Sequence, residues 1–152
     1  MTKRHAIIDA LVVRLKTLTT ANGYSSNAGF AVYDWHPENL QAATVPMLNV
    51  MDRAETVEDL GGGDRTEHKL SVDVTGNVSN GVNTISDARA LLGDIAKCLM
   101  SPTDRTLGGA CDSISMSDGG TIQLEQATDG TRASVSLSLS VLYRTTRGDW
   151  SV

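Results

Sequence analysis

The sequence is poor in aromatic residues, in proline and in cysteine, the residue that cross-links small domains and binds zinc. Its 152 residues include one Phe, three Tyr, two Trp, three Pro and two Cys. Cys98 and Cys111 lie far apart and form neither a CxxC motif nor a zinc-ligand spacing, which disfavours a zinc site. Cys98 falls on the apolar side of a predicted helix, where a thiol acts as a small hydrophobic group. We expect a reducing compartment.

Long hydrophobic runs and an excess of positive charge are also missing. No segment approaches the roughly 20 apolar residues that cross a bilayer, and the charged start of the chain lacks the apolar core of a signal peptide. The net charge of −5 disfavours a general nucleic-acid-binding surface and a polybasic membrane patch. We therefore expect a soluble protein that is not exported by a cleaved signal and has no membrane partner.

The familiar motifs of enzymes and metal proteins are absent as well. The glycine-rich segment 61–66 lacks the Lys of a phosphate-binding P-loop. His5, His36 and His68 match no metal-binding spacing, and the serines of segment 134–140 lie in no GxSxG elbow. The sequence thus predicts no catalytic, cofactor-binding or metal site, and we expect that the protein is not an enzyme.

One polar stretch, from Asp52 to Lys69, holds several carboxylates that could pair as acid and base or bind a hard cation. They are Glu55, Glu58, Asp59, Asp64 and Glu67. Because they lie in a glycine-containing polar stretch rather than on a rigid element, we interpret them as a solvated charge cluster. The stretch itself is predicted to be a long mobile loop or a long hairpin.

The length and composition indicate one domain over residues 1–152. A chain of this size buries enough surface for a core of its own. Apolar residues make up 40% of the chain and aromatic residues only 4%, so the core should be mainly aliphatic.

Two segments have the apolar periodicity of amphipathic helices. The first includes Ile7, Leu11 and Leu18 and is predicted to end near Asn22-Gly23. The second begins at Thr84-x-x-Asp87, which resembles a capping box, and ends before Ser101-Pro102.

Several short segments are predicted to be strands. The clearest is Ser134 to Arg144, where apolar residues alternate with serines over the whole segment, after an Asp129-Gly130 hairpin signal. The others are Phe30 to Trp35, closed by Pro37, Val45 to Met51, Leu70 to Val78 before Asn80-Gly81, Ser113 to Met116 and Thr121 to Gln126. This order predicts an α+β fold with a mainly antiparallel sheet and two helices packed on one face.

Two features of the chain suggest contacts with other molecules. The serine row, including Ser136 and Ser138, is a face of small side chains that can meet solvent, a neighbouring subunit or a passage. Trp35 and Trp150 lie in polar, loop-like sequence. Each tryptophan either anchors a partner or caps the edge of the core.

The chain resembles the tail terminator proteins of long-tailed bacteriophages. The resemblance rests on the opening helix that ends in Ala21-Asn22-Gly23-Tyr24, the Val45-Pro46 strand start, Leu107-Gly108-Gly109 after the second helix, and a last strand that ends in Tyr143-Arg144-Thr145 before Gly148-Asp149. It covers nearly the whole chain in element order.

The resemblance implies a structural virion protein at the tail–neck junction, assembled in the host cytoplasm. Such a subunit forms a hexameric ring on the head-proximal end of the tail tube, stops tube polymerisation and offers a surface to the neck of the head. Its partners are other copies of itself, the tail tube protein and the head–neck connector. DNA passes through the lumen without specific binding, and no cofactor belongs to this role.

Ring closure needs two different patches on each subunit. We place one on the 52–69 stretch, where Glu55, Glu58, Asp64 and Arg65 are candidate interface residues, and the other on a sheet edge. Trp35, Ser136, Ser138 and Trp150 are further candidates. A head-closure or neck connector protein of the same particle and a small ligand-binding domain remain alternatives.

Overall fold

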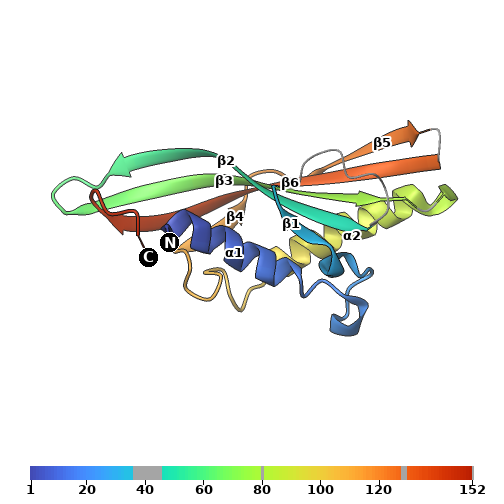
Figure 1. Cartoon of the computed structure of the whole chain (residues 1–152), viewed down its shortest axis with the longest axis horizontal. Coiled ribbons are helices and arrows are strands. Elements are labelled where there is room, and N and C mark those ends of the chain that lie inside the picture. Colours follow the sequence, from blue (N-terminus) through green and yellow to red (C-terminus); the bar gives the residue numbers. More distant parts are fainter. Residues whose placement is uncertain (36–45, 80, 128–129, 152) are drawn as a thin grey trace.

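The computed structural model describes residues 1–35, 46–79, 81–127 and 130–151, and it has two helices packed against one side of a six-stranded sheet (Figure 1). The predictions that concern His36, Pro37, Val45, Asn80 and Asp129 lie outside the described residues. The helices are α1 (Lys3–Leu15) and α2 (Thr84–Leu99), and the strands are β1 (Val32–Asp34), β2 (Met47–Asp59), β3 (Arg65–Val78), β4 (Ser113–Met116), β5 (Thr121–Ala127) and β6 (Gly130–Thr146).

The sheet is mainly antiparallel, as the sequence predicts. Its strands follow the order β1-β2-β3-β6-β4, and β5 also pairs with β6. Strands β4 and β5 lie along successive parts of the same side of β6. Among the described residues, the one parallel pair joins β1 to the start of β2. The described structure therefore has the predicted α+β architecture.

Strands β3 and β6 form the centre of the sheet. All 14 residues of β3 pair with β6, from Arg65 opposite Thr146 to Val78 opposite Ala133. Side chains alternate across the pleat, so the even-numbered residues of β3 and the odd-numbered residues of β6 from Ala133 to Thr145 are buried on one face. This face carries the Leu and Val side chains that the alternating sequence placed in the core.

Both helices cover this buried face. Helix α1 buries Ile7, Ile8, Leu11 and Leu15, and α2 packs mainly against β6. Figure 1 shows the two helices on the same side of the sheet, while no helix of the described residues lies on the opposite side. No helix in the part of the chain that the structure describes is long and apolar enough to cross a membrane.

The helix ends differ in detail from the prediction. Helix α1 ends at Leu15 rather than near Asn22-Gly23. The chain turns after Leu15, and Leu18 is still buried. The amide of Gly29 donates to the carbonyl of Leu18. Thr84 is the first helical residue of α2 rather than its cap, and its hydroxyl donates to the carbonyl of Gly81 at 2.8 Å.

The stretch from Asp52 to Lys69 was predicted to be a long mobile loop or a long hairpin, and it forms the hairpin. Strands β2 and β3 pair from Met47 to Asp59, and only residues 60–64 join them. Strand β2 is thus much longer than the predicted segment, which ended at Met51. The predicted alternation of Leu70, Val72 and Val74 continues upstream through His68 and Thr66, which are also buried. Polar side chains hid this periodicity in the sequence.

The pairing of β2 with β3 contains a β-bulge between Asp52 and Glu55. Asp52 lies opposite Val72 and Glu55 opposite Leu70, so β2 has one more residue than β3 over this interval. The extra residue turns Glu55 to the helix side of the sheet, where a regular strand would place Ala54 and Thr56.

Gly29 allows the segment before β1 to lie against the end of α1. Its amide donates to Leu18 O at 2.8 Å. A Cβ at this position would lie 2.6 Å from Lys16 O and 2.8 Å from Leu18 O, and backbone atoms cannot move aside as a flexible side chain can.

We expect Gly29→Ala to lower the free energy of unfolding by about 2 to 3 kcal/mol because the added methyl group overpacks this contact. Gly61→Ala is the matched control, since a Cβ at Gly61 meets nothing within 4 Å. Its effect should stay within about 0.5 kcal/mol. Denaturant unfolding of both variants measures the difference, and equal stabilities would contradict the close-contact explanation.

Candidate functional site

A cluster of aromatic and charged side chains lies where the β2–β3 hairpin leaves the helices. Glu55 is its centre, because the bulge directs this carboxylate to the helix side and leaves it only 8% exposed. The hydroxyl of the buried Tyr143 donates to Glu55 Oε1. A charge in such surroundings needs donors around it, and β6 supplies the first of them.

His68 lies beside Glu55 and Tyr143 and is fully buried. Its ring stacks on Tyr143 at a centroid distance of 4.6 Å. Nε2 lies 2.8 Å from Thr145 Oγ1, whereas Nδ1 has no hydrogen-bond partner among the described residues and lies 3.6 Å from Glu55 Oε1.

Trp150 covers this cluster from the C-terminal end of the chain. Its ring meets His68 edge-on at a centroid distance of 4.7 Å, and its carbonyl accepts from the amide of Lys3 at 2.9 Å. Since 45% of the Trp150 side chain is exposed, the residue both caps the core edge and presents an aromatic surface to solvent.

Trp35 is held at the surface by contacts on several sides. Its indole N–H donates to Asp52, its amide donates to Val50 O at 3.0 Å, and the Arg53 guanidinium lies 5.1 Å from its ring centroid. The backbone φ of Trp35 is +47°, a strained value for a bulky residue. These contacts offset the strain, and Trp35 as a whole residue is 49% exposed.

Arg4 connects the two parts of the site. Its guanidinium pairs with Asp52, and Nη1 lies 4.0 Å from Glu55 Oε2. Burial by itself would raise the pKa of Asp52, but hydrogen bonds from Trp35 and Arg4 outweigh it and hold this pKa below its usual value. Asp52 therefore remains an acceptor near neutral pH.

The pKa of Tyr143 is raised far above its ordinary value, first by burial and then by the hydrogen bond to the Glu55 carboxylate. The phenol thus stays protonated and donates to Glu55. The arrangement joins α1, the bulge, β6 and the C-terminal tail, and its ionisable groups interact with one another. Among the described residues, no group of three His, Cys, Asp or Glu side chains is placed to hold a metal ion.

The structure brings together only some of the predicted interface residues. Trp35, Glu55 and Trp150 meet in one network, but Glu55 is a nearly buried member of it rather than part of a solvated loop. That expectation was wrong because the bulge reverses the direction of the side chain. The sequence also gave no sign of His68, Arg4 and Asp52 as partners, although His68 continues the alternation of β3.

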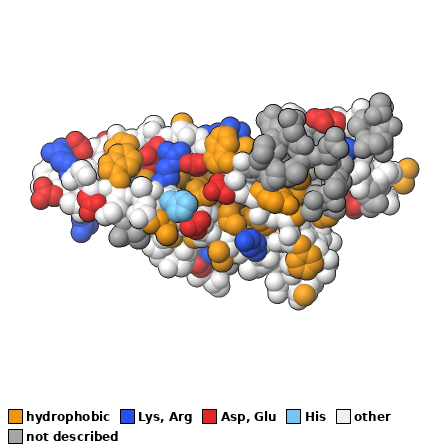
Figure 2. Space-filling model, in the orientation of Figure 1, with side chains coloured by type: hydrophobic (Ala, Val, Ile, Leu, Met, Phe, Trp, Pro, Cys, Tyr) orange, Lys and Arg blue, Asp and Glu red, His pale blue; other side chains and the backbone are white. Residues whose placement is uncertain are grey.

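The other candidates of the hairpin lie at its far end. Glu58 and Arg65 are exposed, and Asp64 O accepts from the amide of Arg147 at 2.7 Å. Arg147 also pairs with Asp59 at 2.6 Å. Figure 2 shows a hydrophobic patch over the β2–β3 arm with charged side chains near it.

Ser136 and Ser138 lie on the face of the sheet opposite the helices. Both side chains are partly exposed, and Ser138 Oγ donates to Asp73 Oδ1 at 2.7 Å. Asp73 in turn pairs with Arg53, the residue that stacks on Trp35. The serine row is thus linked through Asp73 to the tryptophan site.

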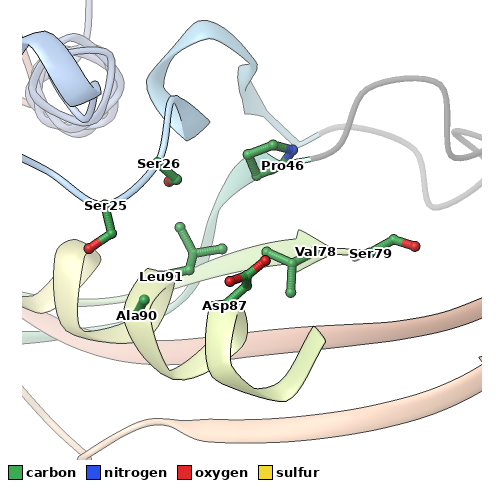
Figure 3. Close-up of a pocket in the computed structure, with 8 residues that line it drawn as sticks. All are labelled: Ser25, Ser26, Pro46, Val78, Ser79, Asp87, Ala90 and Leu91. Carbon is green, nitrogen blue, oxygen red and sulfur yellow. The ribbon is translucent and has the colours of Figure 1, made fainter. Parts of the chain in front are cut away.

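A pocket of about 260 Å³ lies between the segment that follows α1 and the start of α2 (Figure 3). Ser25, Ser26 and Pro46 lie on one side, and the end of β3 and the first turns of α2 on the other. Its volume is below the roughly 300 to 1,000 Å³ of most small-molecule sites. A more open groove of about 430 Å³ lies between α1 and residues 101–107.

Comparison of the sequence with models of protein families and with curated proteins finds no match.

We expect Glu55→Ala to lower the free energy of unfolding by about 2 to 3 kcal/mol, because it leaves the Tyr143 hydroxyl without its acceptor in a buried site. Glu58→Ala removes an exposed carboxylate from the same strand and should change stability by no more than about 0.5 kcal/mol. Chemical denaturation of the two variants gives the comparison. Similar losses for both would refute the central role of Glu55.

The raised pKa of Tyr143 predicts a loss of stability in alkaline solution. The folded protein holds this proton more tightly than the unfolded chain, whose tyrosine has the ordinary pKa of 10.0. The stabilisation is therefore fully present below that pH and declines as the pH rises above it. Tyr143→Phe should remove this part of the pH dependence.

Denaturant unfolding of both proteins between about pH 8 and pH 11 measures the effect as a difference. Burial also raises the pKa of the Cys111 thiol, to about 11, but this contribution is common to both proteins and cancels. Parallel stability curves across this range would contradict the raised pKa of Tyr143.

Proposed function

We propose that the chain is a structural virion protein of the tail terminator type, which forms a ring on the head-proximal end of a phage tail tube. In this role the ring ends tube polymerisation and provides the attachment surface for the head–neck connector, with DNA passing through its lumen. The ring stands at the tail–neck junction of the virion and is assembled in the host cytoplasm. We propose no catalytic activity, cofactor or metal for it.

The observation that carries the proposal is a sheet with two different free edges. Among the described residues, the outer side of β2 from Met51 to Asp59 pairs with no strand, and neither does the outer side of β5. A closed ring of identical subunits needs two unlike patches that meet head to tail. Free strand edges bind other strands readily, so two unlike edges on one subunit favour this kind of assembly.

The uncovered face of the sheet also fits a ring with a passage. Its central part consists of small or uncharged polar side chains and one carboxylate, Asp73, that Ser138 and Arg53 engage. These side chains are Ser71, Asp73, Thr75, Asn77, Ser134, Ser136, Ser138 and Ser140. Together with the net charge of −5, the central part of this face offers few cations to hold DNA phosphates. Lys69, Arg132 and Arg144 lie toward the two ends of the same face.

The Trp35 and Trp150 site suits contacts with other tail or neck proteins. Tryptophan is enriched among the residues that dominate binding energy. Asp52 and Arg53 hold the Trp35 ring, and His68 packs against the Trp150 ring, before any partner arrives. A preformed aromatic surface loses little conformational entropy on binding. We assign this surface to the tube protein or the connector rather than to the ring contact.

The proposal predicts that the purified chain forms six-fold rings of uniform size. Light scattering coupled to size exclusion gives the mass, for comparison with the 16.1 kDa subunit, and negative-stain microscopy gives the symmetry. Added to polymerising tail tube protein, the rings should shorten the tubes and be found at one end of them.

Two other outcomes would overturn the assignment. Rings that bind the head connector but leave tube length unchanged would identify a head-closure or neck protein of the same particle. A protein that stays monomeric at high concentration and whose melting temperature rises with a small molecule would be a ligand-binding domain.

A further inference from the structure

Among the described residues, each of the two free edges of the sheet carries one large apolar side chain that is half-exposed. On β2 it is Val57, which is 49% exposed, and on β5 it is Leu124, which is 50% exposed. Val57 lies opposite His68 and Leu124 lies opposite Ala133, and both of these partners are buried on the helix side. Residues opposite each other point to the same face, so Val57 and Leu124 share the helix side of the sheet.

The strand directions are compatible with pairing between two copies in the same orientation. Strand β3 is antiparallel to β2, β6 is antiparallel to β3, and β5 is antiparallel to β6. Strand β5 therefore runs opposite to β2 within one subunit. If a second copy is placed beside the first with its helices on the same side, its β2 meets the first copy's β5 as an antiparallel neighbour.

One register of this pairing joins the apolar side chains and separates the carboxylates. With Val57 opposite Leu124, antiparallel pairing sets Thr56 opposite Glu125 and Glu58 opposite Gln123. Cross-strand apolar pairs stabilise a sheet, and like charges directly opposite each other destabilise it. In this register no two carboxylates are opposed.

The alternative pairings of the same edges are less favourable. A parallel arrangement with Val57 opposite Leu124 would oppose Glu58 and Glu125. A two-fold contact between two β2 edges centred on Val57 would oppose Glu55 and Asp59. Charge thus disfavours both of these pairings, and the strand directions permit the head-to-tail contact between β2 and β5. A two-fold contact between two β5 edges centred on Leu124 opposes no two carboxylates, but it closes a dimer and leaves the β2 edge unused.

We infer that residues 55–59 at the edge of β2 pair with the β5 edge, residues 121–127, of a second copy of this chain, with Val57 against Leu124. This contact would be the interface between neighbouring subunits of the proposed ring, so the inference rests on the proposed function. It extends the six-stranded sheet of each subunit into that of the next and uses main-chain hydrogen bonds as well as the apolar pair.

The contact also sets the inclination of the strands. Val57 lies opposite His68, which lies opposite Tyr143 of β6, whereas Leu124 lies opposite Ala133 of β6. The two edge positions are therefore ten residues apart along β6. Successive copies are therefore displaced along the strand direction, and a closed ring requires strands that are inclined to its axis, as in closed barrels.

Cysteine cross-linking of the full chain tests the inference. In the double variant Val57→Cys/Leu124→Cys the two Cβ atoms of a cross-strand pair lie within the range of a disulfide. Mild oxidation should convert most of the protein into covalent oligomers up to the size of the ring, and a mixture of the two single variants should give covalent dimers only. Cys98 and Cys111 are buried, and oxidation of the unmodified chain measures how much cross-linking these two cysteines give.

The matched control for the register is Val57→Cys/Gln123→Cys, in which the second thiol points to the opposite face of β5. It should cross-link at less than about a tenth of the yield, because the two side chains lie on different faces of the sheet. Leu124→Lys should in addition raise the apparent dissociation constant of the ring at least tenfold, whereas Gln123→Lys should change it less than threefold.

The possible results separate this inference from the proposed function. Rings without the Val57–Leu124 disulfide would refute the edge pairing and leave the ring-forming role intact. Efficient dimerisation of Leu124→Cys alone would show a two-fold contact between β5 edges and also refute it. An unmodified chain that stays monomeric would refute both the pairing and the ring.

Discussion

The pairing of β3 with β6 along the whole of β3 is the constraint on which the rest of the structure depends. Two long strands in one register commit their side chains to one face or the other for the full length of the sheet. Except for Leu142, the aliphatic residues of these two strands fall on one side, and the two helices cover that side. The opposite face is therefore left to serine, threonine and asparagine, and the sheet keeps an edge at each end of its strand order.

The bulge in β2 is the main departure from this regular pattern, and the candidate site depends on it. One additional residue brings Glu55 into the core face, where a carboxylate would be costly without donors. Tyr143 donates to it, while Arg4 and His68 lie close by. Because these groups come from both termini and the central strands, the network ties the ends of the chain to the hairpin and supports Trp35 and Trp150 at the surface.

The same features give the chain three surfaces of different chemistry. The edges of β2 and β5 offer unpaired backbone groups with one apolar side chain each. The uncovered face is small and polar, and the tryptophan site is aromatic and preformed. A subunit of a ring that joins a tube to a neck needs surfaces for its own copies, for its lumen and for other proteins, which is why we favour an assembly role over a site for chemistry.

Much of the fold was predictable from the sequence, because periodicity reports directly which residues share a face. The alternation of Val135 to Tyr143, the apolar stripe of α2 and the order of the elements led to the α+β fold with both helices on one side, and the structure confirms it. The tail terminator assignment stays a prediction. Pairing between distant strands, the bulge at Asp52 and the meeting of Glu55 with Tyr143, His68 and Arg4 were decided only by tertiary structure. These depend on contacts between residues up to 88 positions apart, and no local pattern of polar residues shows which carboxylate will turn inward.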